Sequence, residues 1–119
     1  MPATVILVYD EHRTAKRFSD AFLVAGHQVV LFADPVEALQ AIDNVHTAQL
    51  LITRVRFAPG RLNGLALASK AKHRRPEIKV LFLAFPEMKP QVDDLGDFLA
   101  MPASTADVVG TAERLMARP

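Results

Sequence analysis

Five short apolar runs alternate along the chain with segments whose apolar residues recur at helical spacing. The clearest run, residues 50–53, has the composition of a strand that is buried on both faces. Repeated strand–helix units predict a parallel sheet covered by helices on both sides. With five strands in 119 residues, we expect a flavodoxin-like, doubly wound α/β fold of order 2-1-3-4-5. The predicted strands are 4–9, 27–32, 49–54, 78–84 and 97–100, and the predicted helices are 14–25, 35–45, 64–74 and one that begins after Ser104.

The helix starts and stops carry local signals. Thr14 is a candidate cap for the first helix, and Gly26 is a typical stop. Asp34, Pro35 and Glu37 together predict a strong start for the second helix. Residues 85–96 differ from the other connections because they contain two prolines and few apolar residues. We therefore expect one or two helical turns there, and so a shortened fourth helix.

Composition narrows the class of protein. The chain has the length of a single domain, 1–119, and 50% of its residues are hydrophobic, which is too many for a disordered chain. The absence of cysteine excludes disulfides and thiolate chemistry. A formal net charge of +1 gives no support for nucleic-acid binding, and the basic residues 70–75 are interpreted as a solvated helix end rather than a phosphate-binding patch. With no apolar stretch long enough to span a membrane and no leader, we expect a cytoplasmic protein.

Charged residues follow the first and third predicted strands. Asp10 and Glu11 come directly after the first, and Arg54 ends the third. In the expected strand order these two strands are neighbours at the point where the winding reverses, which is where ligand sites form in open α/β sheets. Arginine is almost never buried without a partner. We therefore expect Arg54 to form an ion pair with Asp10, and also with Glu11.

Several stretches resemble the receiver domains of two-component response regulators, and together they span nearly the full chain. They cover the first strand with its acidic end, the second strand and the start of the second helix, the third strand with its loop, and the fifth strand. The matching residues are 6–11, 25–29, 33–39, 50–60, 63–65 and 97–102. The resemblance implies the CheY-like fold and a role in phosphorelay signal transduction.

The resemblance also implies that the phosphorylation site is degenerate. In the family, two acids after the first strand bind Mg²⁺, and Asp10 and Glu11 keep that character. The aspartate that accepts the phosphoryl group is replaced by Arg54. The hydroxyl residue ending the fourth strand is replaced by Ala84, and the lysine before a proline is replaced by Met101. The chain is therefore identified as an atypical pseudo-receiver that lacks the phosphoacceptor aspartate.

This replacement removes the chemistry of the site. A guanidinium has no lone pair with which to attack phosphorus and stays protonated. Mg²⁺ requires oxygen ligands in near-octahedral geometry, and Arg54 supplies none and adds positive charge. We expect no catalysis, no metal and no cofactor, with the guanidinium standing where the ion would lie.

Other classes of function remain as alternatives. A receiver could be phosphorylated at a non-standard residue among Asp10, Glu11 and His12, or the same residues could hold a metal. A small ligand-binding α/β domain is a further alternative. Nucleotide binding is disfavoured because the first turn has no glycine. His27 and His46, which lie at the edges of predicted elements, are interpreted as surface residues.

Protein–protein recognition is the function that the resemblance favours. In the family, the first helix and nearby loops contact histidine kinases or phosphotransfer proteins, whereas the fourth and fifth helices with the fifth strand contact outputs or a second copy. The expected partner is a histidine kinase, a phosphotransfer protein or another regulator, with a homodimer as a further candidate and adaptor or decoy as the role. On the first helix, Arg13, Lys16 and Arg17 are the predicted contact residues.

A second candidate surface lies beside the shortened fourth helix. Phe85 and Met88 are the predicted contact residues there, and Val92 and Phe98 lie near them in the sequence pattern. Phe98 matches the switch aromatic position of the family's fifth strand. These four apolar residues predict either a small local core or an exposed apolar patch that binds a partner.

Overall fold

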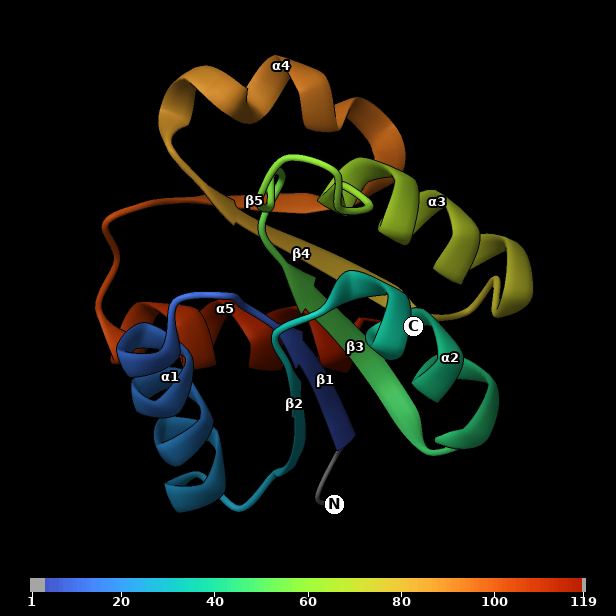
Figure 1. Ribbon diagram of the computed structural model, residues 1–119. Helices are drawn as coiled ribbons and strands as arrows, with labels where there is room; N and C mark the ends of the chain where they lie inside the picture. The colour runs from blue at the N-terminus through green and yellow to red at the C-terminus, as the bar shows by residue number, and fades with distance from the viewer. Residues whose placement is uncertain (1–3, 119) are drawn as a thin grey trace.

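A parallel sheet of five strands forms the centre of the molecule (Figure 1). The computed structural model describes residues 4–118. All neighbouring strands are parallel and follow the order β2-β1-β3-β4-β5, so the predicted topology is confirmed. The strands are β1 (Thr4–Val8), β2 (Gln28–Phe32), β3 (Ala48–Thr53), β4 (Lys79–Ala84) and β5 (Asp97–Ala100).

Helices cover both faces of this sheet. On one face, α1 packs beside α5 over strand residues such as Val5 and Leu7, and on the other, α2 packs beside α3 over residues such as Ile6 and Val8. Successive residues of β1 thus point into two separate cores, as the period of two in a strand requires. No helix within residues 4–118 is long and apolar enough to cross a membrane. The helices are α1 (His12–Val24), α2 (Pro35–Asn44), α3 (Gly64–Arg74), α4 (Lys89–Val92) and α5 (Thr105–Ala117).

The first helix begins two residues earlier than predicted. Glu11, and not Thr14, is its cap: the carboxylate of Glu11 accepts hydrogen bonds from the backbone N–H groups of Arg13 (3.1 Å) and Thr14 (2.8 Å). A carboxylate satisfies the free N–H groups of a helix start and also matches its positive dipole end. The carboxylate of Glu11 is therefore held at the N-terminus of α1.

The segment before β5 contains little regular helix, as predicted. A 3₁₀ turn at Pro86–Met88 leads into the four residues of α4, and a second 3₁₀ turn follows at Asp93–Leu95. Asp93 has φ of +47°, which ends α4 at Val92. The shortened fourth helix is therefore present in the structure.

The basic cluster 70–75 lies at the end of α3, and Lys70, His73 and Arg74 are exposed there as predicted, but Arg75 is not solvated. The side chain of Arg75 is only 16% exposed, and its guanidinium donates to the backbone carbonyls of Val45 (2.8 Å), His46 (3.0 Å) and Ala48 (3.0 Å). These carbonyls lie between the end of α2 and the first residue of β3, and that of Val45 also accepts from the N–H of Ala48. Arg75 therefore serves the fold by joining α3 to this connection.

One histidine prediction is wrong. His27 is not a surface residue: its side chain is 11% exposed, its Nε2 lies 2.8 Å from a carboxylate oxygen of Glu113, and its ring lies against Phe22. The bend at Gly26 (φ +92°) turns the chain inward between α1 and α5, so this ring is covered. His46 is exposed, as expected.

Candidate functional site

An ion pair joins the carboxyl ends of β1 and β3. Because Val8 lies opposite Thr53 in the sheet, the residues that follow these strands emerge side by side. Nη1 of Arg54 donates to Oδ1 of Asp10 over 2.8 Å, so the expected pairing of these two residues is present. Their side chains are 35% and 31% exposed. A pair this accessible to water stabilises a fold by about 1 kcal/mol or less, well short of a buried pair.

Glu11 does not share in this ion pair. It is exposed and caps α1 instead, which corrects the expectation that both acids would meet Arg54. Hydrogen bonds from Thr14, first from its side chain and then from its backbone N–H, hold the pKa of Glu11 below its usual value. The carboxylate is therefore directed at the helix N-terminus rather than at the guanidinium.

Tyr9 is a member of the site that was not predicted from the sequence. The guanidinium carbon of Arg54 lies 4.9 Å from the centroid of the Tyr9 ring, a cation–π arrangement. The ring edge in turn meets Phe18 of α1, with centroids 5.8 Å apart. Burial raises the pKa of Tyr9, and the positive charge of Arg54 offsets part of that rise. In the sequence, Tyr9 could have been found as an aromatic residue directly before Asp10, at the end of a buried strand.

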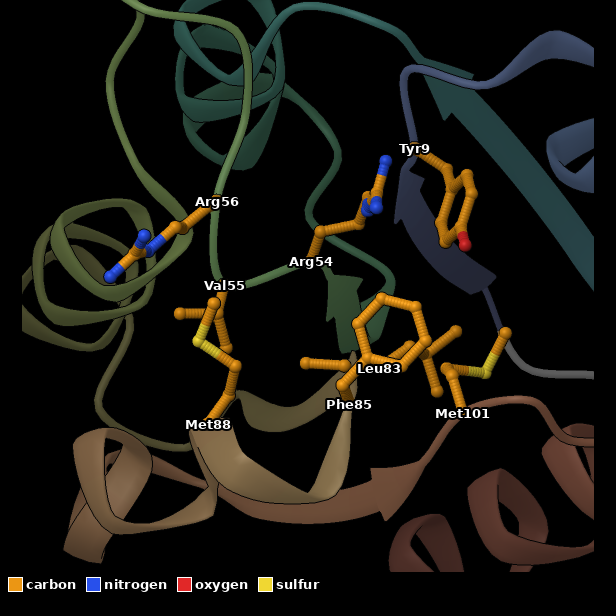
Figure 2. Close-up of a pocket in the computed structure, with 9 residues that line it drawn as sticks. Tyr9, Arg54, Val55, Arg56, Leu83, Phe85, Met88 and Met101 are labelled. Carbon is orange, nitrogen blue, oxygen red and sulfur yellow. The ribbon is translucent and has the colours of Figure 1, made fainter.

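Ala84 and Met101 face the same end of the sheet. The backbone N–H of Met101 donates to the carbonyl of Ala84 over 2.8 Å, which brings β4 and the loop after β5 together. Both residues line a small cavity of about 80 Å³ beside Arg54 (Figure 2). A methyl group and a thioether therefore stand where the family resemblance would place a hydroxyl and an ammonium group.

The apolar residues around α4 are divided between core and surface. Val92 is buried, and Met88 and Phe98 pack partly against the core beneath α2 and α3. Phe85 is 57% exposed at the rim of the cavity. The local core accounts for three of the four predicted residues, and Phe85 alone presents a large exposed apolar surface.

The start of α3 lies directly against the backbone of Arg54. The N–H of Gly64 donates to the carbonyl of Val55 over 2.8 Å, and Asn63 caps the helix by accepting from the N–H of Ala66. A Cβ atom at Gly64 would overlap the carbonyl oxygen of Arg54. Glycine is therefore required there for β3 and α3 to meet.

The residues at this edge do not fit Mg²⁺. Within residues 4–118, no three Asp, Glu or His side chains gather closely enough to hold a metal ion. Asp10 is engaged by a cation, Glu11 is engaged by the N-terminus of α1, and the guanidinium adds positive charge where oxygen ligands are needed. This edge of the sheet therefore supplies no ligand set for an octahedral cation.

Comparison with known proteins identifies the fold. No family model matches the sequence, and neither does any curated protein, whereas many solved structures match. A putative response regulator from Chloroflexus aurantiacus is 26% identical, with 99% of this chain and 100% of that chain covered and a TM-score of 0.87. The chain has the receiver fold. Among other receiver structures, chemotaxis protein CheY4 of Vibrio cholerae is 21% identical, with 97% and 99% covered and a TM-score of 0.85.

The receiver fold also matches part of a larger regulator. The receiver domain of NtrX from Brucella abortus is 23% identical, with 97% of this chain and 99% of that chain covered and a TM-score of 0.86. Against a longer NtrX chain, this chain spans 27% of the length. The receiver fold places Asp10, Arg54, Ala84 and Met101 at one edge of the sheet, since each follows or ends a parallel strand.

Proposed function

We propose that this chain is a phosphorylation-independent receiver-like domain that acts in two-component or phosphorelay signalling by binding a protein partner. Its partner is a histidine kinase, a phosphotransfer protein or another regulator. The proposal includes no enzymatic step. It rests on the receiver fold together with the chemistry of the residues at the carboxyl edge of the sheet.

The Arg54–Asp10 ion pair carries the proposal. A receiver that accepts a phosphoryl group needs a carboxylate nucleophile and free carboxylates for Mg²⁺, whereas here a protonated guanidinium holds Asp10 at 2.8 Å. Ala84 and Met101 offer no hydroxyl or ammonium group to a phosphate. The three departures are consistent with one another, which supports a domain that has lost phosphate chemistry and kept its binding surfaces.

The first helix, α1, carries exposed basic side chains that a partner can contact. Arg13 and Arg17 are exposed on α1 and form no ion pair with the described residues, so their charges are available to an acidic partner. Lys16 is engaged by Asp20 over 2.9 Å. Among the predicted contact residues of α1, we therefore expect Arg13 and Arg17 to contribute more to partner binding than Lys16.

Binding measured with and without a phosphodonor tests this proposal. Purified histidine kinases and phosphotransfer proteins of the same organism would be titrated into the chain, with and without acetyl phosphate and Mg²⁺. We expect at least one partner to bind with an affinity that changes less than about twofold, because no phosphoryl group is taken up. Arg13→Glu with Arg17→Glu should weaken this complex about tenfold, a loss of about 1.4 kcal/mol, while Lys70→Glu on α3 should not.

Two outcomes would contradict the proposal. One is binding that requires the phosphodonor, and the other is stable uptake of labelled phosphate by the chain. Uptake that survives replacement of Asp10 and Glu11 by alanine would point to a non-standard acceptor. Arg54→Asp alone should not restore phosphorylation-dependent binding, since Ala84 and Met101 still lack the phosphate contacts.

A further inference from the structure

The cavity beside Arg54 has an apolar floor and polar groups on one side only. Its floor and walls come from Val55, Leu83, Ala84, Met88 and Met101. Its polar side chains are those of a tyrosine and two arginines, and no acidic side chain lines it. Figure 2 shows the side chains of Phe85, Met88 and Met101 bordering this space from below and the Tyr9 ring and Arg54 from above.

The hydroxyl of Tyr9 opens onto this cavity without a partner. Tyr9 is only 8% exposed, yet its hydroxyl makes no hydrogen bond with any residue of 4–118. In Figure 2 the hydroxyl is at the end of the ring nearer Met101, on the cavity side. No fully buried side-chain oxygen or nitrogen of the described residues lacks a hydrogen-bond partner, so this hydroxyl is reached by solvent. A molecule in the cavity that accepts a hydrogen bond would therefore take the place of water at the Tyr9 hydroxyl.

Arg54 has spare donors for the same acceptor. A guanidinium carries five N–H donors, and the structure assigns one acceptor, Asp10, to that of Arg54. Asp10 does not line the cavity, so its carboxylate does not border this space. Arg56 is exposed and without an ion-pair partner among the described residues, and in Figure 2 it points away from Tyr9, so it adds positive charge at the rim. These charges favour an anion.

The size of the cavity limits the ligand to a few atoms. An apolar cavity of about 150 Å³ holds one benzene molecule, and this one measures about 80 Å³. We propose that the cavity binds a short-chain aliphatic carboxylate, with its carboxylate toward Arg54 and the Tyr9 hydroxyl and its alkyl group against Leu83, Ala84 and Met101. This inference goes beyond the proposed function, because it assigns a small-molecule site where a receiver would carry phosphate.

An NMR titration with sodium butyrate tests the assignment. Amide shifts would be followed in the ¹⁵N-labelled chain, with sodium chloride at equal ionic strength and n-butylamine as the matched controls. We expect saturable shifts at Ala84, Phe85, Met88 and Met101, with a dissociation constant in the millimolar range because so small a ligand has few contacts. Butylamine has the same alkyl group with the opposite charge and should cause no saturable shift.

Two conservative variants locate the site. Tyr9→Phe keeps the ring beneath Arg54 and removes the hydroxyl, and it should weaken butyrate binding about fivefold. Ala84→Val fills the cavity and should abolish the saturable shifts, while Ala100→Val, which adds the same atoms on exposed β5, should leave them unchanged. No saturable shift, equal shifts with butylamine, or unchanged binding in both Tyr9→Phe and Ala84→Val would overturn the proposal.

Discussion

Replacing Gly64 by alanine is expected to destabilise the fold by about 3 kcal/mol, because an added Cβ overlaps the backbone carbonyl of Arg54. A backbone carbonyl cannot rotate away as a flexible side chain can, so either β3 or the start of α3 has to move. For a domain of this size, the loss corresponds to a decrease in melting temperature of about 10 °C. Thermal unfolding followed by circular dichroism measures it.

Gly110→Ala is the matched control for this variant. Gly110 lies inside α5, where an added Cβ meets only the flexible end of Arg114 at 3.6 Å. Alanine in a helix interior is favoured over glycine by about 0.5–1 kcal/mol, so this change should stabilise the chain. Equal melting temperatures for Gly64→Ala and the wild type would show that α3 does not sit against Arg54 as described.

The second large effect is expected for Arg75→Ala. Arg75 supplies hydrogen bonds to the carbonyls of Val45, His46 and Ala48, and alanine leaves all three acceptors without this partner. The carbonyl of Val45 keeps its bond from the N–H of Ala48. Because a hydrogen bond from a charged group is worth more than a neutral one and two of the three bonds are partly buried, we expect a loss of about 3 kcal/mol. Urea unfolding at equilibrium gives the free energy directly.

Arg114→Ala serves as the comparison for Arg75→Ala. Arg114 is exposed on α5, and among residues 4–118 its side chain bonds only to the Thr111 hydroxyl, so its removal should change the unfolding free energy by less than about 0.5 kcal/mol. If Arg75→Ala were as mild as this control, the three carbonyl contacts would contribute nothing, and Arg75 would behave as the solvated helix-end residue that the sequence predicts.

The sheet order and the main ion pair could be predicted from the sequence. Alternating apolar runs and helical patterns have few compatible topologies, and an arginine that ends a buried strand needs an acidic partner at the same sheet edge. Arg54 therefore indicated Asp10 across 44 positions. Likewise, the two prolines and the few apolar residues of 85–96 predicted a short α4.

Other features of the site depend on contacts that a linear pattern does not contain. Glu11 could either pair with Arg54 or cap α1. It caps α1, because the free N–H groups of Arg13 and Thr14 follow it directly in the chain. In the sequence, Tyr9 resembles one more apolar residue of the first strand. Its contact with Arg54 arises because β1 and β3 end side by side. Arg75 bonds to backbone carbonyls about 30 positions away, and no side-chain pattern marks those acceptors.

A magnesium titration followed by NMR tests most directly whether the guanidinium of Arg54 has replaced metal and phosphoryl chemistry at this edge. The wild-type chain should show no saturable shifts at Asp10 and Glu11 as Mg²⁺ is added. Arg54→Asp, which adds a third carboxylate beside them, should show such shifts and serves as the positive control. Saturable Mg²⁺ shifts at Asp10 and Glu11 in the wild-type chain, with Arg54 released from Asp10, would contradict this account.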